Sequence, residues 1–331
     1  MTLMRSTNLA LAAALIIACA VAARPAGAQD APAKAADLLA QARKALGGDR
    51  LRAVKSLQAS GTFRRVAGNN TLDGDLDIEI QLPDKYRRNE SVDGPLGQTI
   101  DRTEALNGTD IWNDTNRSGG PGGGGFGGGG LGRGDRGGFG GFGGGARRGG
   151  DAAARGGGDA QGANGAAAGG RRQFDPERLR QLQLRMRQAD FSRLLIALLL
   201  STDAPATWVG TAQSREGNAD VVEIQPADGD ATRLFLDQAT HMPLMLTWQG
   251  PAFAAGRAGR GGARAQGDAQ AQPPAAPTLA MHLGDYTTVD GIKLPSTITR
   301  SVNDQTIEDV SIKRYKVNPS FKADTFTQPK K

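Results

Sequence analysis

Strict alternation of apolar and polar residues is the feature that most constrains the fold of this chain. Between residues 72 and 82, leucine, isoleucine or glycine occupies every second position, and acidic residues or glutamine fill most of the positions between them. Successive side chains of a β-strand point to opposite faces of the sheet. The pattern therefore predicts a strand with one apolar and one polar face, as in an antiparallel sheet with one face buried and one solvated.

Similar segments, separated by turn residues, predict about eleven strands in all. The expected strands cover residues 56–66, 72–82, 98–105, 110–115, 207–214, 219–225, 232–237, 242–249, 279–288, 292–302 and 307–317. A turn at Pro83-Asp84 is expected to bring Lys85, Arg87 and Arg88 back to face the acids of residues 73–79. We predict a mainly β, α+β fold: a large curved antiparallel sheet, or half-barrel.

Two segments have helical periodicity. Residues 32–46 carry apolar side chains at helical spacing, and Gly47-Gly48 ends the segment. Asp175-Pro176 forms an N-cap and first-turn pair for a helix to about residue 189, with a restart or kink at Asp190. Residues 191–200 then read FSRLLIALLL. We expect this second helix to cover the apolar face of the sheet, with the N-terminal helix helping.

Two low-complexity inserts interrupt the pattern. Of the 52 residues 119–170, 28 are glycine, and residues 251–277 are rich in Ala, Gly and Gln. We expect disordered inserts at 116–172 and 251–277 within a single domain spanning 29–331. The net charge of +6 comes from the inserts and the leader, so the folded part is nearly neutral. The charge therefore does not indicate a nucleic-acid-binding protein, although the Arg/Gly/Phe insert resembles RGG segments.

The first 28 residues predict a secretory signal peptide. Residues 9–23 are an unbroken apolar run that is short for a membrane span, and Ala26-Gly27-Ala28 offers a cleavage site after Ala28. This interpretation predicts a periplasmic protein. The alternative is a lipoprotein anchored to the membrane, because Ile16-Ile17-Ala18-Cys19 fits a loose lipobox in which Cys19 is lipidated.

Five segments carry a resemblance to a known group of proteins. They are ALGG with LRAVKSLQASGTF (45–63), FSRLLIALLL (191–200), TRLFLDQATHMPLMLTW (232–248), DYTTVDGIKLPSTITR (285–300) and KRYKVNPSFKADTF (313–326). Together they resemble predicted bacterial periplasmic proteins related to the outer-membrane lipoprotein-sorting, LolA/LolB-like superfamily. The resemblance implies a half-barrel under a helical lid, with acyl chains held between the two. It covers nearly all of the expected folded part but neither insert.

The candidate ligand-binding residues are therefore apolar. Side chains on the sheet and lid helix are expected to line a cavity or, alternatively, to fill a plain core: Phe63, Leu76, Ile78, Ile80, Trp112, Leu195, Leu198, Trp208, Phe235, Leu244, Leu246 and Trp248. The alternation Met242, Leu244, Leu246, Trp248 is expected to face one way. The lid run 191–200 is either a mobile lid or a buried core helix.

The remaining polar candidates favour structural roles. Asp73, Asp75, Asp77 and Glu79 lie at two-residue spacing, so successive acids stand ~7 Å apart, which is poor geometry for one metal ion without other ligands. A carboxylate pair for general acid/base work is the other functional interpretation, and a solvated face paired with Lys85, Arg87 and Arg88 is the favoured one. His241 reads as a turn residue and His282 as a strand residue, and one cysteine provides no disulfide framework. We expect no catalytic residues, no metal and no cofactor, and a hydrolase is the least favoured function.

Two functions remain open at this point. The first is a monomeric periplasmic carrier or binding protein that shields a hydrophobic ligand or lipoprotein acyl chains from water. The second is a structural or sensory envelope module with no transported ligand. The inserts are expected to be uninvolved linkers or else to contact an envelope protein or an anionic membrane surface; nucleic acid is not an expected partner.

Overall fold

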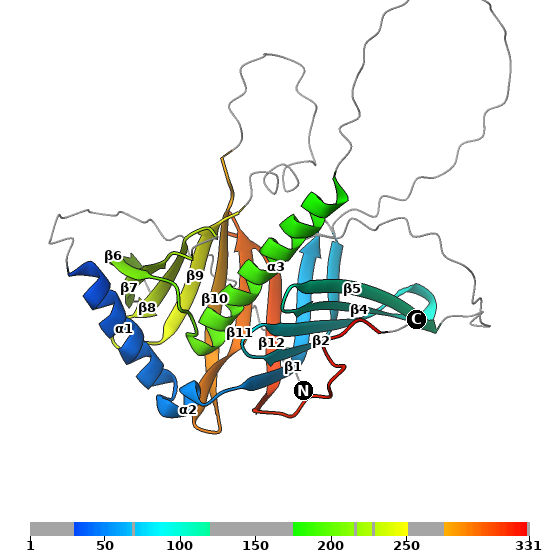
Figure 1. Cartoon of the computed structure of the whole chain (residues 1–331), viewed down its shortest axis with the longest axis horizontal. Coiled ribbons are helices and arrows are strands. Elements are labelled where there is room, and N and C mark those ends of the chain that lie inside the picture. Colours follow the sequence, from blue (N-terminus) through cyan, green and yellow to red (C-terminus); the bar gives the residue numbers. More distant parts are fainter. Residues whose placement is uncertain are drawn as a thin grey trace, which may run out of the picture.

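The computed structural model describes residues 30–67, 70–119, 175–214, 217–226, 229–250 and 275–329. The predicted signal peptide, Cys19 and Ala28 lie outside these residues, as does most of both inserts. The described chain forms one open twelve-stranded antiparallel sheet with three helices, which confirms the predicted fold class (Figure 1). The helices are α1 (Ala31–Leu46), α2 (Asp49–Arg52) and α3 (Pro176–Leu199), with a short 3-10 turn at Pro95–Gly97.

The strands follow the order β5-β4-β3-β2-β1-β12-β11-β10-β9-β8-β7-β6 across the sheet. Their bounds are β1 (Ser56–Ala67), β2 (Asn70–Gln81), β3 (Lys85–Asp93), β4 (Gln98–Asn107), β5 (Asp110–Gly119), β6 (Ala206–Ser214), β7 (Gly217–Ile224), β8 (Thr232–Asp237), β9 (Pro243–Gln249), β10 (Thr278–Val289), β11 (Ile292–Val302) and β12 (Gln305–Val317). The first strand therefore pairs with the last in the middle of the sheet, and β5 and β6 form its two edges.

The backbone conformation of two short turns explains the hairpins β10–β11 and β11–β12. Asp290 and Gly291 have φ values of 51° and 77°, and Asn303 and Asp304 have φ values of 47° and 62°. Two consecutive residues with positive φ suit the two-residue turns that match the twist of antiparallel strands. The predicted turn at Asp290-Gly291 is confirmed.

The boundaries of the first insert differ from the prediction. The β4–β5 ladder continues through Gln98↔Gly119, so residues 116–119 belong to the sheet. At the second insert, the backbone N–H of Gly250 donates to the carbonyl of Pro277 over 2.7 Å. This bond joins the end of β9 to the start of β10.

Helix α3 links the two edges of the sheet, since it follows β5 and precedes β6 in the chain. The carboxylate of Asp175 accepts from the Glu177 N–H at 3.0 Å, as the predicted N-cap requires, and Leu200 ends the helix in the left-handed conformation. No restart occurs at Asp190, because its carboxylate pairs with Arg193 one turn later, at 3.3 Å, instead of capping a new helix. Figure 1 shows α3 running obliquely in front of the sheet, with its N-terminal end projecting beyond the strands.

The face of the sheet under α1 and α3, here called the inner face, carries the main core. Each predicted apolar residue of α1 is buried against it, namely Ala35, Leu38, Leu39, Ala42 and Leu46. From the strands, the core receives side chains at alternate positions, among them Leu57, Phe63, Leu76, Ile78, Ile80, Leu106, Val222, Leu234, Leu236, Leu246, Met281, Leu294, Ile298 and Val310. Period-two patterning thus yields one apolar face, as the sequence predicts.

The acids of residues 73–79 lie on the opposite, outer face of the sheet, where they form ion pairs and hydrogen bonds. Arg64 Nε lies 2.7 Å from Asp73 Oδ1, the Ser60 hydroxyl donates to Asp77, and Arg87 Nε lies 3.1 Å from Glu79 Oε2. The expectation for Arg88 is wrong. Neighbouring residues of a strand point to opposite faces, so Arg88 points to the inner face while Arg87 meets the acids.

Candidate functional site

Most of the predicted ligand-binding residues meet on the inner face beneath α3. The residues buried together there are Phe63, Leu76, Ile78, Ile80, Leu195, Leu198, Leu246 and Trp248, with Trp208 half-buried at the margin. They come from both halves of the sheet, β1–β5 and β6–β12, and from the helix. The site is therefore assembled only when the two halves are joined at β1 and β12.

Two of the predicted residues lie on the outer face instead. Phe235 packs with Ala219, Val221, Met245 and Ala280, because its neighbours Leu234 and Leu236 take the inner positions of β8. Trp112 is covered by the C-terminal segment, where its indole N–H donates to the carbonyl of Phe326 over 2.9 Å.

Leu244 is not brought to the site either, because β9 contains a β-bulge. Phe235 pairs with Met245 and Leu236 with Pro243, which leaves Leu244 without a cross-strand partner. Its side chain is 39% exposed, whereas Leu246 is completely buried. The run from Met242 to Trp248 therefore does not act as one uniform apolar face.

The C-terminal half of α3 closes the site with apolar side chains. Phe191 and the run from Leu195 to Leu200 are buried, and the Phe191 ring lies 5.6 Å from that of Tyr86. Arg193 enters the same layer: its guanidinium stands 4.7 Å from the Trp248 ring and its Nε donates to the Thr232 hydroxyl at 3.4 Å. Burial lowers the pKa of Arg193 from its usual value.

Polar contacts fasten α3 at its middle and at its end. Arg187 donates to Glu104 of β4 at 2.7 Å and to Asn113 of β5 at 3.0 Å. Arg43 of α1 donates to the carbonyl of Leu200 through Nε and Nη2, at 3.3 and 3.1 Å. Toward its N-terminus the helix makes fewer such contacts, and Leu179 and Leu182 are exposed there.

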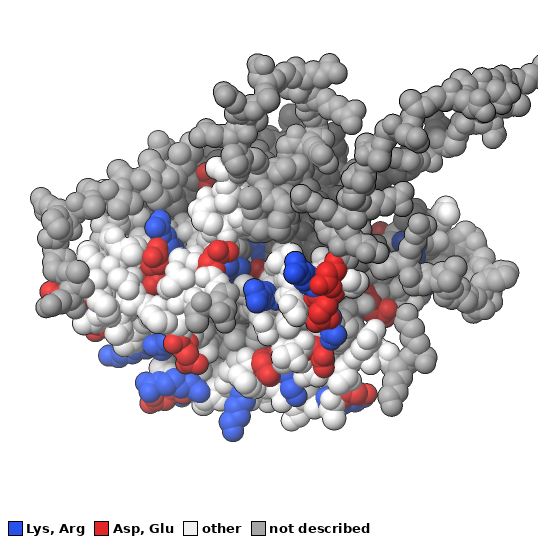
Figure 2. Space-filling model, turned by 45° about the horizontal axis from the view of Figure 1, so that its top comes forward, with Lys and Arg blue, Asp and Glu red and all other residues white. Residues whose placement is uncertain are grey.

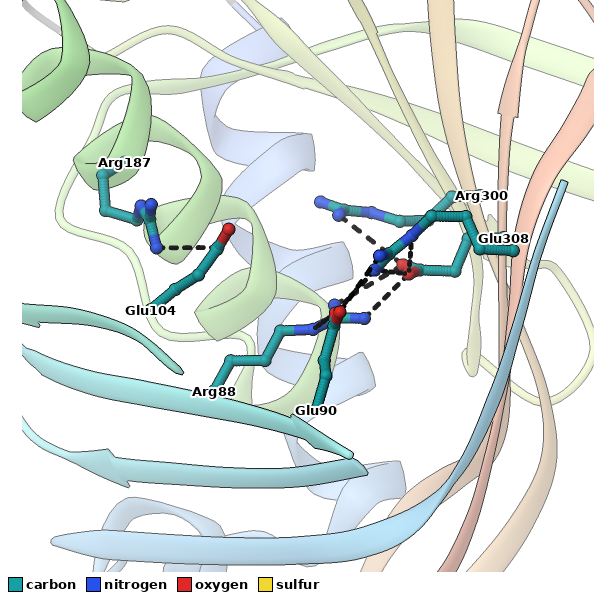
Figure 3. A network of polar contacts seen from close by, with 7 residues as sticks. Arg88, Glu90, Glu104, Arg187, Arg300 and Glu308 are labelled. Atoms are coloured by element: carbon teal, nitrogen blue, oxygen red, sulfur yellow. Dashed lines mark hydrogen bonds and ion pairs between the residues drawn. The ribbon is translucent and has the colours of Figure 1, made fainter. Parts of the chain in front are cut away.

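An ion cluster lies on the inner face beside the apolar core (Figure 3). We define it as Arg65 of β1, Arg88 and Glu90 of β3, Arg300 of β11 and Glu308 of β12. Glu308 Oε1 lies 2.7 Å from Arg88 Nη2 and 2.5 Å from Arg65 Nη2, and Glu90 Oε1 lies 2.8 Å from Arg88 Nε. Arg300 is the outermost partner, with Nη1 3.9 Å from Glu308 Oε2. The cluster joins the two halves of the sheet, since Figure 3 shows Arg88 and Glu90 pointing toward Arg300 and Glu308.

The arginines hold the acids of the cluster ionised. Burial by itself would raise the pKa of Glu308, but the charges of Arg88, Arg300 and Arg65 outweigh it and bring the pKa to about 2. Burial likewise opposes ionisation of Glu90, whose pKa is nevertheless lowered by Arg65 and Arg88. Asp190 of α3 differs: burial raises its pKa despite the charges of Arg300, Arg193 and Arg187 that face it.

Sequence reasoning missed this cluster, although one signal for it was present. Arg65 follows Phe63 by two positions and Arg300 follows Ile298 by two, so both charged residues occupy the apolar alternation of their strands. A charge in that alternation indicates a polar group that a partner must satisfy inside the fold. The partner could not be identified, because Glu308 is 243 residues from Arg65.

Two hollows of the described structure lie on the outer side, beneath the C-terminal segment. One of about 1050 Å³ is lined by Glu79, Arg87, Trp112 and Phe321 among others, and one of about 570 Å³ by Val54, Leu82 and Phe321 among others. Between the inner face and α3, apolar side chains of the sheet and of the helix are buried together in one cluster. Basic and acidic side chains are interspersed over the surface shown in Figure 2.

Other kinds of site receive no support in the described part of the chain. His241 follows the turn between β8 and β9, as predicted, and His282 lies in β10. Within the described ranges, no three side chains of His, Cys, Asp or Glu come together to hold a metal ion. None of the described helices is both long and apolar enough to cross a membrane.

No protein-family model matches the chain, and no curated protein matches it. Among solved structures, it is similar to an outer membrane lipoprotein-sorting protein domain from Vibrio parahaemolyticus, at 10% identity, TM-score 0.42, and coverage of 89% of this chain and 97% of that one. A LolA superfamily protein from Nitrosomonas europaea gives the same four values. A DUF1329 family protein from Desulfovibrio piger shares 8% identity at TM-score 0.40, with coverage of 88% and 96%. At these values the likeness concerns the fold alone.

Proposed function

We propose that the protein is an envelope carrier or binding protein that shelters acyl chains between the inner face and α3. The observation that carries this proposal is a largely apolar face, drawn from both halves of the sheet and closed by the apolar C-terminal half of α3. The sequence resemblance to lipoprotein-sorting carriers supports the same function. We propose no catalytic role for the chain.

In this proposal the structure shows the lid helix in its closed position. The apolar side chains of α3, such as Leu195 and Leu198, occupy the place that an acyl chain takes when the helix moves away. Each buried methylene contributes ~0.8 kcal/mol, so a long acyl chain offsets the loss of the α3 contacts. The lid must therefore be held loosely enough to exchange with the ligand.

The test is uptake of a fluorescent long-chain fatty acid by the mature protein starting at Gln29. We expect saturable binding, and we expect Arg187→Ala to accelerate uptake about tenfold, because it releases α3 from Glu104 and Asn113. Arg178→Ala is the matched control: Arg178 lies on the same helix, but its ion pair with Asp175 stays within α3. Failure of both the wild type and Arg187→Ala to take up the probe would contradict the carrier function.

One observation favours a second candidate, a structural or sensory envelope module. The side chains between inner face and helix are already buried against one another, and a module without a transported ligand needs nothing more. Native mass spectrometry of protein purified from the periplasm, with lipid extraction of the same sample, separates the two. Stoichiometric lipid supports the carrier, and a ligand-free mass together with failed uptake supports the module.

The cell compartment is part of the proposal. We propose secretion to the periplasm by the predicted signal peptide, with cleavage after Ala28. Mass determination of the mature N-terminus distinguishes this from anchoring through a lipidated Cys19, which predicts a diacylated N-terminal fragment.

A further inference from the structure

The ion cluster and the apolar core form one continuous surface along the same strands. Arg65 lies two residues beyond Phe63, with its guanidinium 4.9 Å from the Phe63 ring centre. Across the β2–β3 pair, Arg88 stands opposite Ile78 and Glu90 opposite Leu76. The inner face is thus apolar over most of its extent and charged at one end. That arrangement matches an amphiphile, with its chain at one end and its head group at the other.

The charge of the cluster is positive. It contains three arginines and two glutamates, and Glu308 and Glu90 are both engaged by Arg65 and Arg88. Buried charges need partners of opposite sign. Of the charged groups of α3, Arg187 pairs with Glu104 and Asp190 pairs with Arg193. The charged side chains of the lid therefore already have partners outside the cluster.

The outer members of the cluster remain accessible. The side chains of Arg65 and Arg300 are 22% and 21% exposed, while those of Arg88, Glu90 and Glu308 are 10% exposed or less. A buried ion cluster contributes less to stability than well-packed apolar residues of the same volume do. The ion cluster lies beside an apolar face and has two arginines at its margin. This position therefore suits recognition of a ligand better than stabilisation of the core.

Building on the proposed function, we propose that the ligand is an anionic amphiphile whose head group binds Arg300 and Arg65. When α3 moves off the sheet, the ligand's carboxylate or phosphate pairs with these two guanidinium groups. The acyl chain then lies along Phe63, Ile78 and Ile298. Binding of the ligand and closure of the lid are thus competing events, because the side chains of α3 occupy the place of the acyl chain.

The experiment compares two probes that differ only in charge. Isothermal titration calorimetry at pH 8 measures the binding of dodecanoate and of dodecan-1-ol to the mature protein. We expect dodecanoate to bind about tenfold more tightly, because a hydrogen-bonded charge pair in a partly buried site is worth roughly one decade in affinity. Millimolar inorganic phosphate is expected not to displace dodecanoate.

Two substitutions of Arg300 should differ in their effects. Arg300→Met is expected to weaken dodecanoate binding about tenfold and leave dodecanol within a factor of two, since Glu308 keeps Arg65 and Arg88 as partners. Arg300→Lys keeps the positive charge and is expected to retain dodecanoate affinity within about threefold of the wild type. Arg314→Met, on the opposite face of β12, is the matched control and should change neither affinity.

The outcomes separate this inference from the proposed function. If wild type binds both probes equally, or if Arg300→Met weakens both alike, the head-group site is wrong and the carrier function stands. Displacement by inorganic phosphate would indicate a site for free anions and would also overturn it. If neither probe binds, both proposals fail. Should Arg300→Met not fold, Arg300→Gln takes its place, because an unchanged affinity of that variant for dodecanoate overturns the head-group site.

Discussion

At the scale of single residues, Glu308 shows how neighbours decide the behaviour of a buried group. Its carboxylate is almost fully enclosed, yet three arginines surround it and keep its pKa at about 2. A carboxylate whose pKa is depressed on folding stabilises the fold above its unfolded pKa, and this contribution is lost as pH falls toward the folded pKa. For Glu308 the relevant interval runs from about 4.5 down to about 2.

We predict that Glu308→Gln lowers the free energy of unfolding by about 3 kcal/mol at pH 7, because three guanidinium groups lose their anionic partner. The wild type should lose stability between pH 5 and pH 3 more steeply than the variant does. Urea unfolding at pH 7, 5 and 3 measures both effects. Glu223→Gln is the control, since Glu223 forms an exposed pair with Arg233 and should cost less than about 1 kcal/mol.

At the scale of elements, the bulge in β9 determines which leucine belongs to the core. Leu244 and Leu246 are two positions apart and would share a face in a regular strand. The extra residue between the pairs Phe235↔Met245 and Leu236↔Pro243 turns Leu244 out while Leu246 stays buried. Identical residues in one strand thus have different roles.

Truncation of each leucine measures this difference. We predict that Leu246→Ala lowers the free energy of unfolding by about 3 kcal/mol, as expected for a fully buried leucine that leaves a cavity. Leu244→Ala should lower it by less than about 1 kcal/mol, because its side chain already contacts water. Chemical denaturation of the two variants is sufficient, and equal losses would contradict the bulge.

At the scale of the whole molecule, the first and the last strand of the chain are neighbours in the sheet. Strands β1 and β12 pair in the centre of the sheet, and the connection from β5 to β6 crosses the inner face as α3. The function-bearing surface therefore depends on contacts between distant parts of the sequence. The Gly-rich insert lies in that same connection, between the end of β5 and the start of α3.

We predict that shortening residues 120–174 to about 20 residues leaves the fold intact and raises the free energy of unfolding by about 1 kcal/mol. A shorter flexible loop loses less entropy when its ends are fixed, and 20 extended residues span up to ~60 Å. Circular dichroism and thermal unfolding check the result. A loss of stability would show that the insert makes structural contacts and is not a plain linker.

Much of the architecture could be predicted from local patterns. Alternation in residues 72–82, the cap at Asp175 and the turn at Asp290-Gly291 each depend on neighbouring residues alone, and each is present in the structure. The helical spacing of Leu38, Leu39, Ala42 and Leu46 likewise identifies the buried face of α1. Such features follow from periods of 2 and 3.6 residues, which any stretch of sequence displays by itself.

Local patterns are enough to predict the class of fold, an antiparallel sheet under a helix with an apolar half. Which residues form the site depends on contacts between distant strands. The tertiary structure placed Trp112 and Phe235 on the outer face, turned Leu244 out, and brought Arg65 and Arg88 to Glu308. Alternation indicates that the side chains of a strand divide between two faces. It does not indicate which face is covered or by which partner, because that depends on strands that meet only when β1 pairs with β12.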